Sequence, residues 1–217
     1  SGGGIYVGPG AAPVIEGSSI TGCSAGTGTG GGIYYAGGCT SILDGCTISN
    51  NSAHSGGGIY YYSGCTSTLT ACSILGNSAE VGAGIYYRVN CVSNLDNCTF
   101  SGNSASETGG ALFYESENSM TITDCGFSGN SADFGGGLYF DPNCSGQIVD
   151  STLTGNTADE DGGAMYIEDA NLAILRCSIS SNTGVRGGGL FGIDCQELTI
   201  VGCTISDNDA VRINVTH

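Results

Sequence analysis

The sequence predicts an all-β fold, a single right-handed parallel β-helix of about eight coils that spans residues 1–217. Three observations predict it: a motif of three small residues recurs along the chain, β-branched and aromatic residues follow each copy, and asparagines recur with the same period. The copies lie 25 to 28 residues apart and begin at Gly2, Gly30, Gly56, Gly82, Gly109, Gly135, Gly162 and Gly187.

One complete repeat runs from Gly56 to Val81, and its second half has the leucine, cysteine, isoleucine and asparagine spacing of leucine-rich repeats. Leucine-rich repeats usually place a helix or helical turn in the second limb of each coil. Here that limb begins with glycines followed by Ile59 and Tyr60, which are poor helix formers and good strand formers. We therefore expect strands on both limbs, joined by turns, with successive coils about 4.8 Å apart. A coil of about 26 residues suits the wide, right-handed β-helix.

The residue that follows each glycine motif is apolar in every repeat, which predicts that it faces the core. Alternation along the strand then turns the next residue outward. This outward position is aromatic throughout and forms an aromatic ladder: Tyr6, Tyr34, Tyr60, Tyr86, Phe113, Tyr139, Tyr166 and Phe191. We expect the ladder to be exposed. It either stiffens the sheet by stacking or binds a glycan or protein surface.

The recurring asparagines predict a structural ladder, because a buried amide both donates and accepts along a stack of identical turns. Its members are Asn51, Asn77, Asn103, Asn130, Asn156, Asn182 and Asn208.

Twelve cysteines predict an oxidising compartment and disulfides that staple a repeat with little core per coil. The expected pairs are Cys39 with Cys46, Cys65 with Cys72, Cys91 with Cys98, Cys195 with Cys203, and Cys125 with Cys144 one coil later. Cys23 and Cys177 remain unpaired in this scheme. The alternative is that the cysteines are reduced core residues. Zinc is disfavoured, because the chain has no C-x-x-C motif and only two histidines.

The charge is one-sided, with 20 acidic residues against four arginines and a formal net charge of −16. This disfavours nucleic acid and anionic membrane surfaces as partners. The chain has no stretch of 18 apolar residues and no signal peptide, so we expect a mature extracellular or cell-surface protein without membrane insertion. Four candidate glycosylation sequons agree with secretion: Asn50, Asn97, Asn143 and Asn214.

Short motifs resemble those of a known repeat class. Phe100–Ala105 and Phe127–Ala132 both have the sequence FSGNSA, and Gly109–Leu112 and Gly162–Met165 have the sequences GGAL and GGAM. They are similar to the paired motifs of the polymorphic outer membrane proteins, which are β-helical passenger domains of autotransporter adhesins. The resemblance implies a β-helix with a surface or adhesin-like role. The chain differs from that family in lacking a membrane barrel and in having Gly-Gly-Gly and Ile at most copies.

The candidate chemistry is limited to two acidic columns. Asp124, Asp150 and Arg176 fall on successive coils and could act on a uronic acid polysaccharide, or form a surface ion ladder. The chain has no lysine to act as a base and no long loops, so we expect no enzyme activity. The only cofactor we consider is calcium, with Asp133, Asp159 and Asp161 as ligands; otherwise these are solvated turns.

Both ends of the chain lack a predicted cap, so unpaired strand edges are expected there. We therefore expect a non-enzymatic subunit of an extracellular filament, a homopolymer that stacks head to tail. The expected interface consists of Gly2, Gly3, Gly4, Ile5, Tyr6 and Val7 of one subunit and Ile213, Asn214, Val215 and Thr216 of the next. The alternatives are a fragment of a longer passenger domain, an adhesin that binds glycan or a cell-surface protein through its tyrosines, and a polysaccharide lyase or hydrolase.

Overall fold

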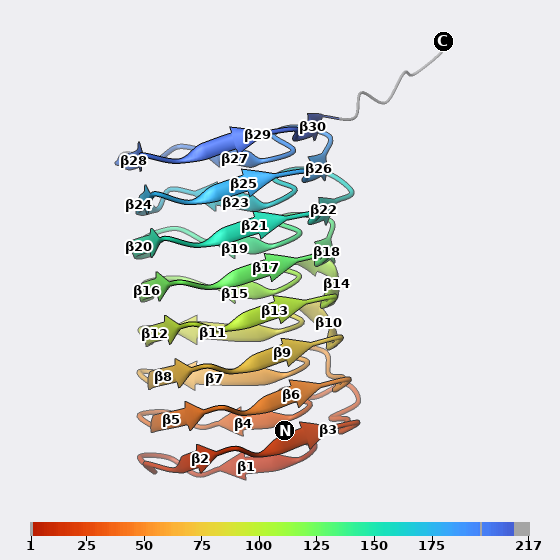
Figure 1. Ribbon diagram of the computed structural model, residues 1–217. Helices are drawn as coiled ribbons and strands as arrows, with labels where there is room; N and C mark the ends of the chain where they lie inside the picture. The colour runs from red at the N-terminus through yellow and green to blue at the C-terminus, as the bar shows by residue number, and fades with distance from the viewer. Residues whose placement is uncertain (1, 196, 211–217) are drawn as a thin grey trace.

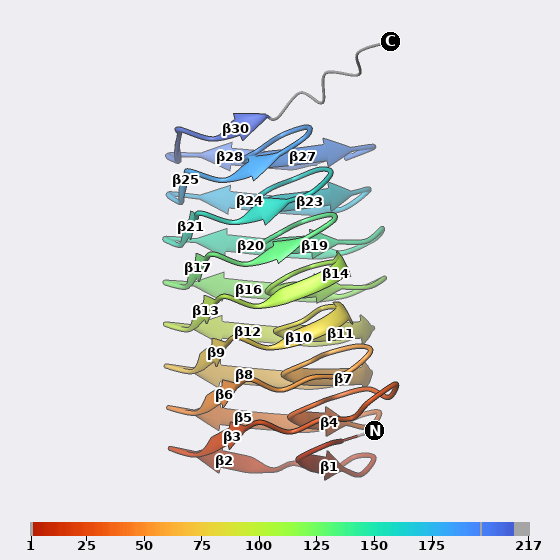
Figure 2. The ribbon, with the colours of Figure 1, turned by 90° about the vertical axis from the view of Figure 1, so that its right-hand side faces the viewer.

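The computed structural model describes residues 2–195 and 197–210 and confirms the predicted fold class. In this part of the chain, thirty β-strands form a parallel β-helix of eight coils, and no helix is present. Figures 1 and 2 show the coils stacked one above another, with three sheets running along the whole rod and a fourth beginning at β10. No described segment forms a helix that is long and apolar enough to cross a membrane.

The strands belong to four parallel sheets, which we number in the order that the chain visits them. The first sheet contains β1 (Ile5–Val7), β4 (Ile33–Tyr35), β7 (Ile59–Ser63), β11 (Ile85–Val89), β15 (Leu112–Tyr114), β19 (Leu138–Phe140), β23 (Met165–Glu168) and β27 (Leu190–Ile193). The second contains β2 (Val14–Glu16), β5 (Thr40–Asp44), β8 (Thr66–Thr70), β12 (Val92–Asp96), β16 (Ser119–Thr123), β20 (Ser145–Val149), β24 (Asn171–Leu175) and β28 (Leu198–Val201).

The third sheet is formed by the strands that follow the second cysteine column, each with a central Ile, Phe or Leu. It contains β3 (Ser19–Thr21), β6 (Thr47–Ser49), β9 (Ser73–Leu75), β13 (Thr99–Ser101), β17 (Gly126–Ser128), β21 (Thr152–Thr154), β25 (Ser178–Ser180) and β29 (Thr204–Ser206). The short fourth sheet precedes the glycine motifs. It contains β10 (Ser78–Val81), β14 (Ser104–Thr108), β18 (Ser131–Ala132), β22 (Thr157–Ala158), β26 (Thr183–Gly184) and β30 (Asp209–Ala210).

Equivalent residues of successive repeats pair in register. Ile59 pairs with Ile85 in the first sheet, Leu69 with Leu95 in the second, and Phe100 with Phe127 in the third. The expectation of strands on two limbs was too simple, because each coil also has the second-sheet strand. The alternation in Thr40–Asp44 explains that strand: Ser41 and Leu43 are buried, and the residues between and beside them are exposed.

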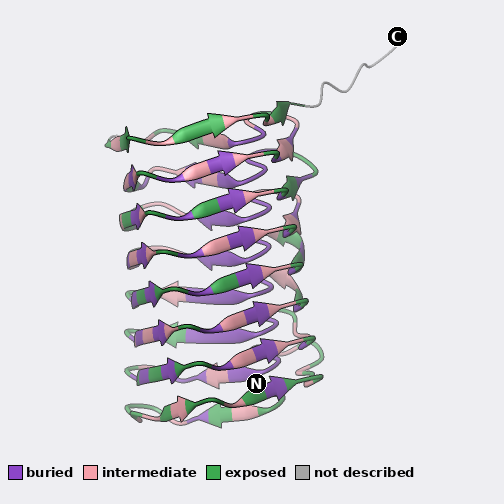
Figure 3. Cartoon of the chain, viewed as in Figure 1, coloured by how far each residue is buried: buried purple, intermediate pink, exposed green. Residues whose placement is uncertain are grey.

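The core is made of stacked columns of identical or similar side chains, and Figure 3 shows it in purple along the inside of the coils. The residue after the glycines is fully buried in the central coils, as the alternation predicts, for example Ile33, Ile59 and Ile85. A second aromatic column lies inside the rod, two residues after these positions: Tyr35, Tyr61, Tyr87, Tyr114 and Phe140. Its tyrosine rings stack 4.6 to 4.8 Å apart.

The hydroxyls of Tyr61, Tyr87 and Tyr114 reach across the core to serines of the second sheet, whereas the buried hydroxyl of Tyr35 has no hydrogen-bond partner. The hydroxyls of Tyr61 and Ser41 lie 3.0 Å apart, and those of Tyr114 and Ser93 lie 2.8 Å apart. These three tyrosines can be buried here because their polar ends have partners.

The glycine motif is required where the chain turns from the fourth sheet into the first. Gly56 adopts a φ of +64°, which L side chains rarely adopt. A Cβ atom on Gly57 would collide with the backbone carbonyl of Ser78 on the next coil. The motif therefore allows two coils to approach each other closely at this corner.

The asparagine ladder follows the third sheet. The backbone N–H and side-chain Nδ2 of Asn51 both donate to Oδ1 of Asn77, at 3.0 and 3.1 Å, and Nδ2 also donates to the carbonyl oxygen of Ile20 at 3.0 Å. The same three bonds recur from Asn77 through Asn182. The first coil has Cys23 at this position, and its backbone N–H donates to Oδ1 of Asn51.

Candidate functional site

The aromatic ladder of the first sheet is stacked as predicted, but the expectation that it is exposed was wrong. Neighbouring tyrosine rings lie nearly parallel, with centroids 5.4 Å apart for Tyr34 and Tyr60 and 4.9 Å apart for Tyr60 and Tyr86. The Phe113 ring is tilted by 53° against Tyr86 and by 67° against Tyr139. The central rings are only 6 to 9% exposed: Tyr60, Tyr86, Phe113 and Tyr139. Each ring covers the next, and side chains of the fourth sheet and the turn after it, Val81 and Phe134, pack against the row.

A row of three carboxylates lies beside this ladder, on the outer side of the first sheet. We call Glu115, Asp141 and Glu168 the carboxylate row. Each lies two residues after an outward aromatic residue, on successive coils, and all three are half-buried. The backbone N–H groups of Glu115 and Asp141 donate to the preceding coil, to the carbonyl oxygens of Tyr87 and Tyr114. The row is therefore held at the spacing of the sheet, about 4.8 Å.

The two outer carboxylates of the row have polar partners. The hydroxyl of Tyr86 donates to Oε2 of Glu115 at 2.6 Å, and Nε of Arg88 lies 3.7 Å from the same oxygen. The hydroxyl of Tyr139 donates to Oε2 of Glu168 at 3.3 Å. Burial, and after it the charges of Glu168 and Glu115, raise the pKa of Asp141 from 3.8 to about 6. Near neutral pH this carboxyl group could accept or release a proton.

Sequence reasoning missed the carboxylate row. The signal was present, since an acidic residue recurs two positions after the outward aromatic residue in three consecutive repeats. It was weak because the preceding coils have Tyr62 and Arg88 at that position.

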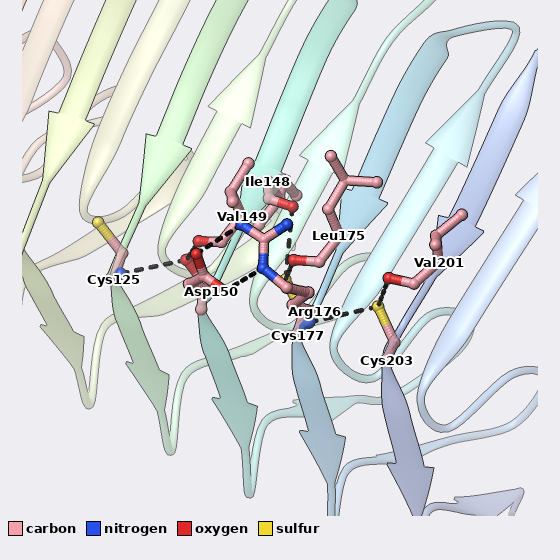
Figure 4. A network of polar contacts seen from close by, with 10 residues as sticks. Cys125, Ile148, Val149, Asp150, Leu175, Arg176, Cys177, Val201 and Cys203 are labelled. Atoms are coloured by element: carbon pink, nitrogen blue, oxygen red, sulfur yellow. Dashed lines mark hydrogen bonds and ion pairs between the residues drawn. The ribbon is translucent and has the colours of Figure 1, made fainter.

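The acidic column that the sequence singled out is an exposed ion pair (Figure 4). Nε and Nη2 of Arg176 donate to the two carboxylate oxygens of Asp150, each at 2.7 Å. Hydrogen bonding to Arg176 lowers the pKa of Asp150. Asp124, Asp150 and Arg176 occupy a turn in which φ is +51°, +49° and +54°. Asp150 is therefore ionised and paired on an open surface, which disfavours it as a general acid.

The three calcium candidates do not form one column. Asp133 and Asp159 lie on neighbouring coils, where the N–H of Glu160 donates to the carbonyl of Asp133. Asp161 is buried and forms a two-point ion pair with the guanidinium of Arg186. Among the residues that the structure describes, no group of three or more His, Cys, Asp or Glu side chains is placed to hold a metal ion.

The expected disulfide pairs were wrong, and all twelve cysteines are free thiols. Cys39 and Cys46 lie at opposite ends of β5, a five-residue strand that spans about 15 Å, whereas bridged Cα atoms lie within about 7 Å. The same separation excludes the in-coil pairs 65–72, 91–98 and 195–203, with β8, β12 and β28 between them. Cys125 follows β16, whereas Cys144 precedes β20 on the next coil. The two cysteines therefore lie at opposite ends of the second sheet and in different cysteine columns.

Apart from Cys23, the cysteines form two columns along the rod, one before and one after the second sheet. Most of them are buried, and their thiols contact backbone carbonyls; for example, Sγ of Cys65 lies 3.1 Å from the carbonyl oxygen of Ala36. They are thus core residues in this structure, the alternative that the sequence left open.

The remaining sequence-predicted positions lie on the surface or outside the described residues. Asn50, Asn97 and Asn143 are exposed turn residues with φ of +53°, +50° and +65°. Within the expected interface, Gly2 to Gly4 lead into β1, which pairs only with β4 among the described strands, and Tyr6 is 58% exposed. Asn214 and the interface residues Ile213, Val215 and Thr216 lie outside the described residues.

Comparisons with known proteins agree with this architecture. A family model described as a right-handed β-helix region matches residues 1–115 and residues 81–217, which together cover the whole chain. Families of this kind include enzymes as well as proteins without catalytic activity. No curated protein and no solved structure matches the chain.

Proposed function

The chain belongs to the family of right-handed β-helix regions, and we propose that it is a non-enzymatic structural subunit of an extracellular filament or surface appendage, which extends by stacking on a second copy. The candidate sequons and the motifs similar to autotransporter passenger domains support the location. The observation that carries the proposal is the set of unpaired strand edges on the first and last described coils, together with the core columns that are exposed at the last one.

The strands of the terminal coils have a neighbour on one side only, within the described part of the chain. β1, β2 and β3 pair with β4, β5 and β6, and β27, β28, β29 and β30 pair with β23, β24, β25 and β26. An unpaired edge exposes a row of backbone N–H and C=O groups that can pair with a further strand. Three strand edges on the first coil and four on the last described coil make a large template for a parallel partner.

The apolar side chains that remain exposed are concentrated at the two ends. Six of the nine exposed large apolar residues lie on the terminal coils, Tyr6 and Val14 on the first and Ile193, Ile200, Val201 and Ile205 on the last, all between 39 and 58% exposed. Tyr6, Val14, Ile193 and Val201 continue columns that face outward along the side of the rod. Figure 3 shows β29, on the last described coil, as largely exposed. Ile200 and Ile205 continue columns that are fully buried one coil earlier, at Ile174 and Ile179. A coil placed on top would bury them in the same way.

The two end faces are complementary because every coil has the same columns. Stacking the first coil of one copy on the last coil of another would place the aromatic residue Tyr6 over Phe191 and Ile5 over Leu190, continuing the register of the first sheet. Such a head-to-tail contact is heterologous and does not close, so it generates a filament.

The sides of the rod support a structural rather than a recognition role. The rings of the aromatic ladder face one another, and Glu115 and Glu168 bond to tyrosines of the neighbouring coil. These side chains are used in contacts between coils. The adhesin alternative depended on exposed Tyr60 and Tyr86, which are buried.

The test is sedimentation velocity over a range of protein concentrations, with negative-stain imaging of the same samples. We expect the chain to associate and to form rods of increasing length. Ile205→Lys places a charge on the end face and should weaken association at least tenfold, because a buried unpaired charge is costly. Ile42→Lys is the matched control, since Ile42 is 44% exposed on the side of the rod and Ile205 is 50% exposed at its end.

A chain that stays monomeric at all concentrations would overturn the proposal. Equal association of both variants would also overturn it, because the contact would then not involve the end faces.

A further inference from the structure

The cysteine column after the second sheet brings thiols of neighbouring coils together. We call it the thiol column: Ser18, Cys46, Cys72, Cys98, Cys125, Ser151, Cys177 and Cys203. Its register is fixed by the strand that follows each member, where Thr99 pairs with Gly126 and Ser178 pairs with Thr204. Each cysteine therefore lies directly above or below its counterpart.

The spacing of these neighbours suits a disulfide, unlike the spacing within a coil. Paired parallel strands are about 4.8 Å apart, and bridged cysteines have Cα atoms about 4.4 to 6.8 Å apart. In two pairs the sulfur also leans toward the preceding coil. Sγ of Cys125 accepts the backbone N–H of Cys98 at 3.4 Å, and Sγ of Cys203 accepts that of Cys177 at 3.3 Å, the contact drawn in Figure 4.

We propose that Cys98 with Cys125, and Cys177 with Cys203, are oxidation sites that form disulfide bonds between neighbouring coils when the protein meets a peroxide. In the first step, one thiolate attacks a peroxide oxygen, the O–O bond breaks, and a sulfenic acid and water are formed. In the second step, the neighbouring thiol attacks the sulfenic sulfur and releases a second water. Two thiols are thus oxidised to one disulfide, and one hydrogen peroxide is reduced to two waters.

The two members of the first pair are suited to different steps. The backbone N–H of Cys98 donates to Sγ of Cys125 at 3.4 Å, and hydrogen bonding from Cys98 lowers the pKa of the Cys125 thiol. The thiolate is the nucleophilic form, so Cys125 is the sulfur that attacks the peroxide and Cys98 the one that resolves the sulfenic acid. In the second pair, Cys203 is half-buried on the terminal coil and is the sulfur that solvent reaches first.

The composition of the thiol column limits disulfide bonds to cysteines on adjacent coils. Ser151 separates Cys125 from Cys177, and its hydroxyl accepts the N–H of Cys125 at 3.1 Å. Each bond therefore fastens two adjacent coils, in a region where only strand pairing and packing hold them. Reversible oxidation would change how easily a coil peels from the rod.

The test is mass spectrometry of the intact chain and of its peptides, after incubation with hydrogen peroxide in urea below the unfolding transition. We expect a loss of two hydrogen atoms for each bond, with cross-linked peptides joining 98 to 125 and 177 to 203, and a higher melting temperature that a reductant reverses. Cys125→Ser should remove the first cross-link. It should fold, because Ser18 and Ser151 occupy this column naturally.

Cys144→Ser is the matched control. Cys144 lies in the other cysteine column, between coils that have Asn118 and Ala170 at its position, so it has no thiol on the adjacent coils. Its substitution should leave both cross-links intact. A chain that gains only oxygen atoms, keeps its reduced mass, or joins Cys72 to Cys98 instead would overturn the proposal.

Discussion

Asp141 shows how a stack of coils changes the chemistry of a single side chain. One aspartate on an open strand would be fully solvated, but here Glu115 and Glu168 lie above and below it and the aromatic ladder lies beside it. The sheet spacing forces three carboxylates together, so the middle one holds its proton more tightly. The raised pKa is a property of the column rather than of the residue.

This pKa predicts a pH dependence of stability. Because the pKa of Asp141 is about 6 in the folded chain and 3.8 ordinarily, folding favours its protonated form. The cost is absent below about pH 4 and fully present above about pH 6, so the free energy of unfolding should fall across that window, by about 1–2 kcal/mol after allowance for solvent screening. Asp141→Asn should remove this fall and stabilise the chain at pH 7.

Urea denaturation at several pH values checks the prediction. Asp44→Asn is the control, since Asp44 is an exposed residue of β5. A difference between Asp141→Asn and the parent chain that is constant from pH 4 to pH 7 would contradict the account.

At the scale of elements, the asparagine ladder joins successive coils at the turn that follows the third sheet. Each side-chain amide in the ladder forms hydrogen bonds with the coil before it and with the coil after it. The hydrogen-bonding groups of one asparagine therefore depend on its neighbours in the ladder. Because the amides are buried, losing one member leaves donors on its neighbour without an acceptor. The ladder thus makes each coil's turn depend on the next coil.

We predict that Asn103→Ala destabilises the chain by about 3–5 kcal/mol. The substitution removes the acceptor for two donors of Asn77, its N–H and Nδ2, and the donor to the carbonyl of Ile74. Asn94→Ala is the control: Asn94 is exposed in β12, and its loss should cost less than about 0.5 kcal/mol. Chemical denaturation measures both, and equal effects would show that the ladder does not carry this stability.

At the scale of the whole molecule, the asparagine ladder is directional, and its direction affects the proposed head-to-tail contact. The amide donors of each member point to the following coil, so in a head-to-tail contact the N–H and Nδ2 of Asn208 would face the first coil of the next copy. That coil offers Cys23, whose thiol is a poor acceptor. The joint would therefore be the weakest step of the stack.

We accordingly predict that Cys23→Asn strengthens association about tenfold, by continuing the ladder across the joint. Cys144→Asn is the matched control, because it makes the same change away from the ends and asparagine occurs naturally at the equivalent position, Asn118. Sedimentation at equal concentrations compares the two variants. If Cys23→Asn associates no better than Cys144→Asn, the copies do not stack in register.

Most of the fold could be predicted from the sequence, because in a solenoid the period of the sequence equals the length of one coil. The glycine motifs and the asparagines fixed the coil length, the number of coils and the positions of the first and third sheets. The strand between the cysteine columns was not expected, and it contains the polar residues Ser41 and Ser67. Only in the folded coil do their hydroxyls meet Tyr61 and Tyr87 across the core.

The candidate site could be predicted only in part, for a related reason. Alternation along a strand determines which side chains point outward, but whether an outward ring is exposed depends on the rings above and below it, and Tyr60 and Tyr86 are covered by their own column. Pairing of cysteines and the protonation of Asp141 likewise depend on distances between coils. The sequence by itself determined the length of the repeat and the columns of side chains that point inward, because these follow from local periodicity. The tertiary structure alone decided which columns are buried, charged or within bonding distance, because those properties arise from contacts between residues about 26 positions apart.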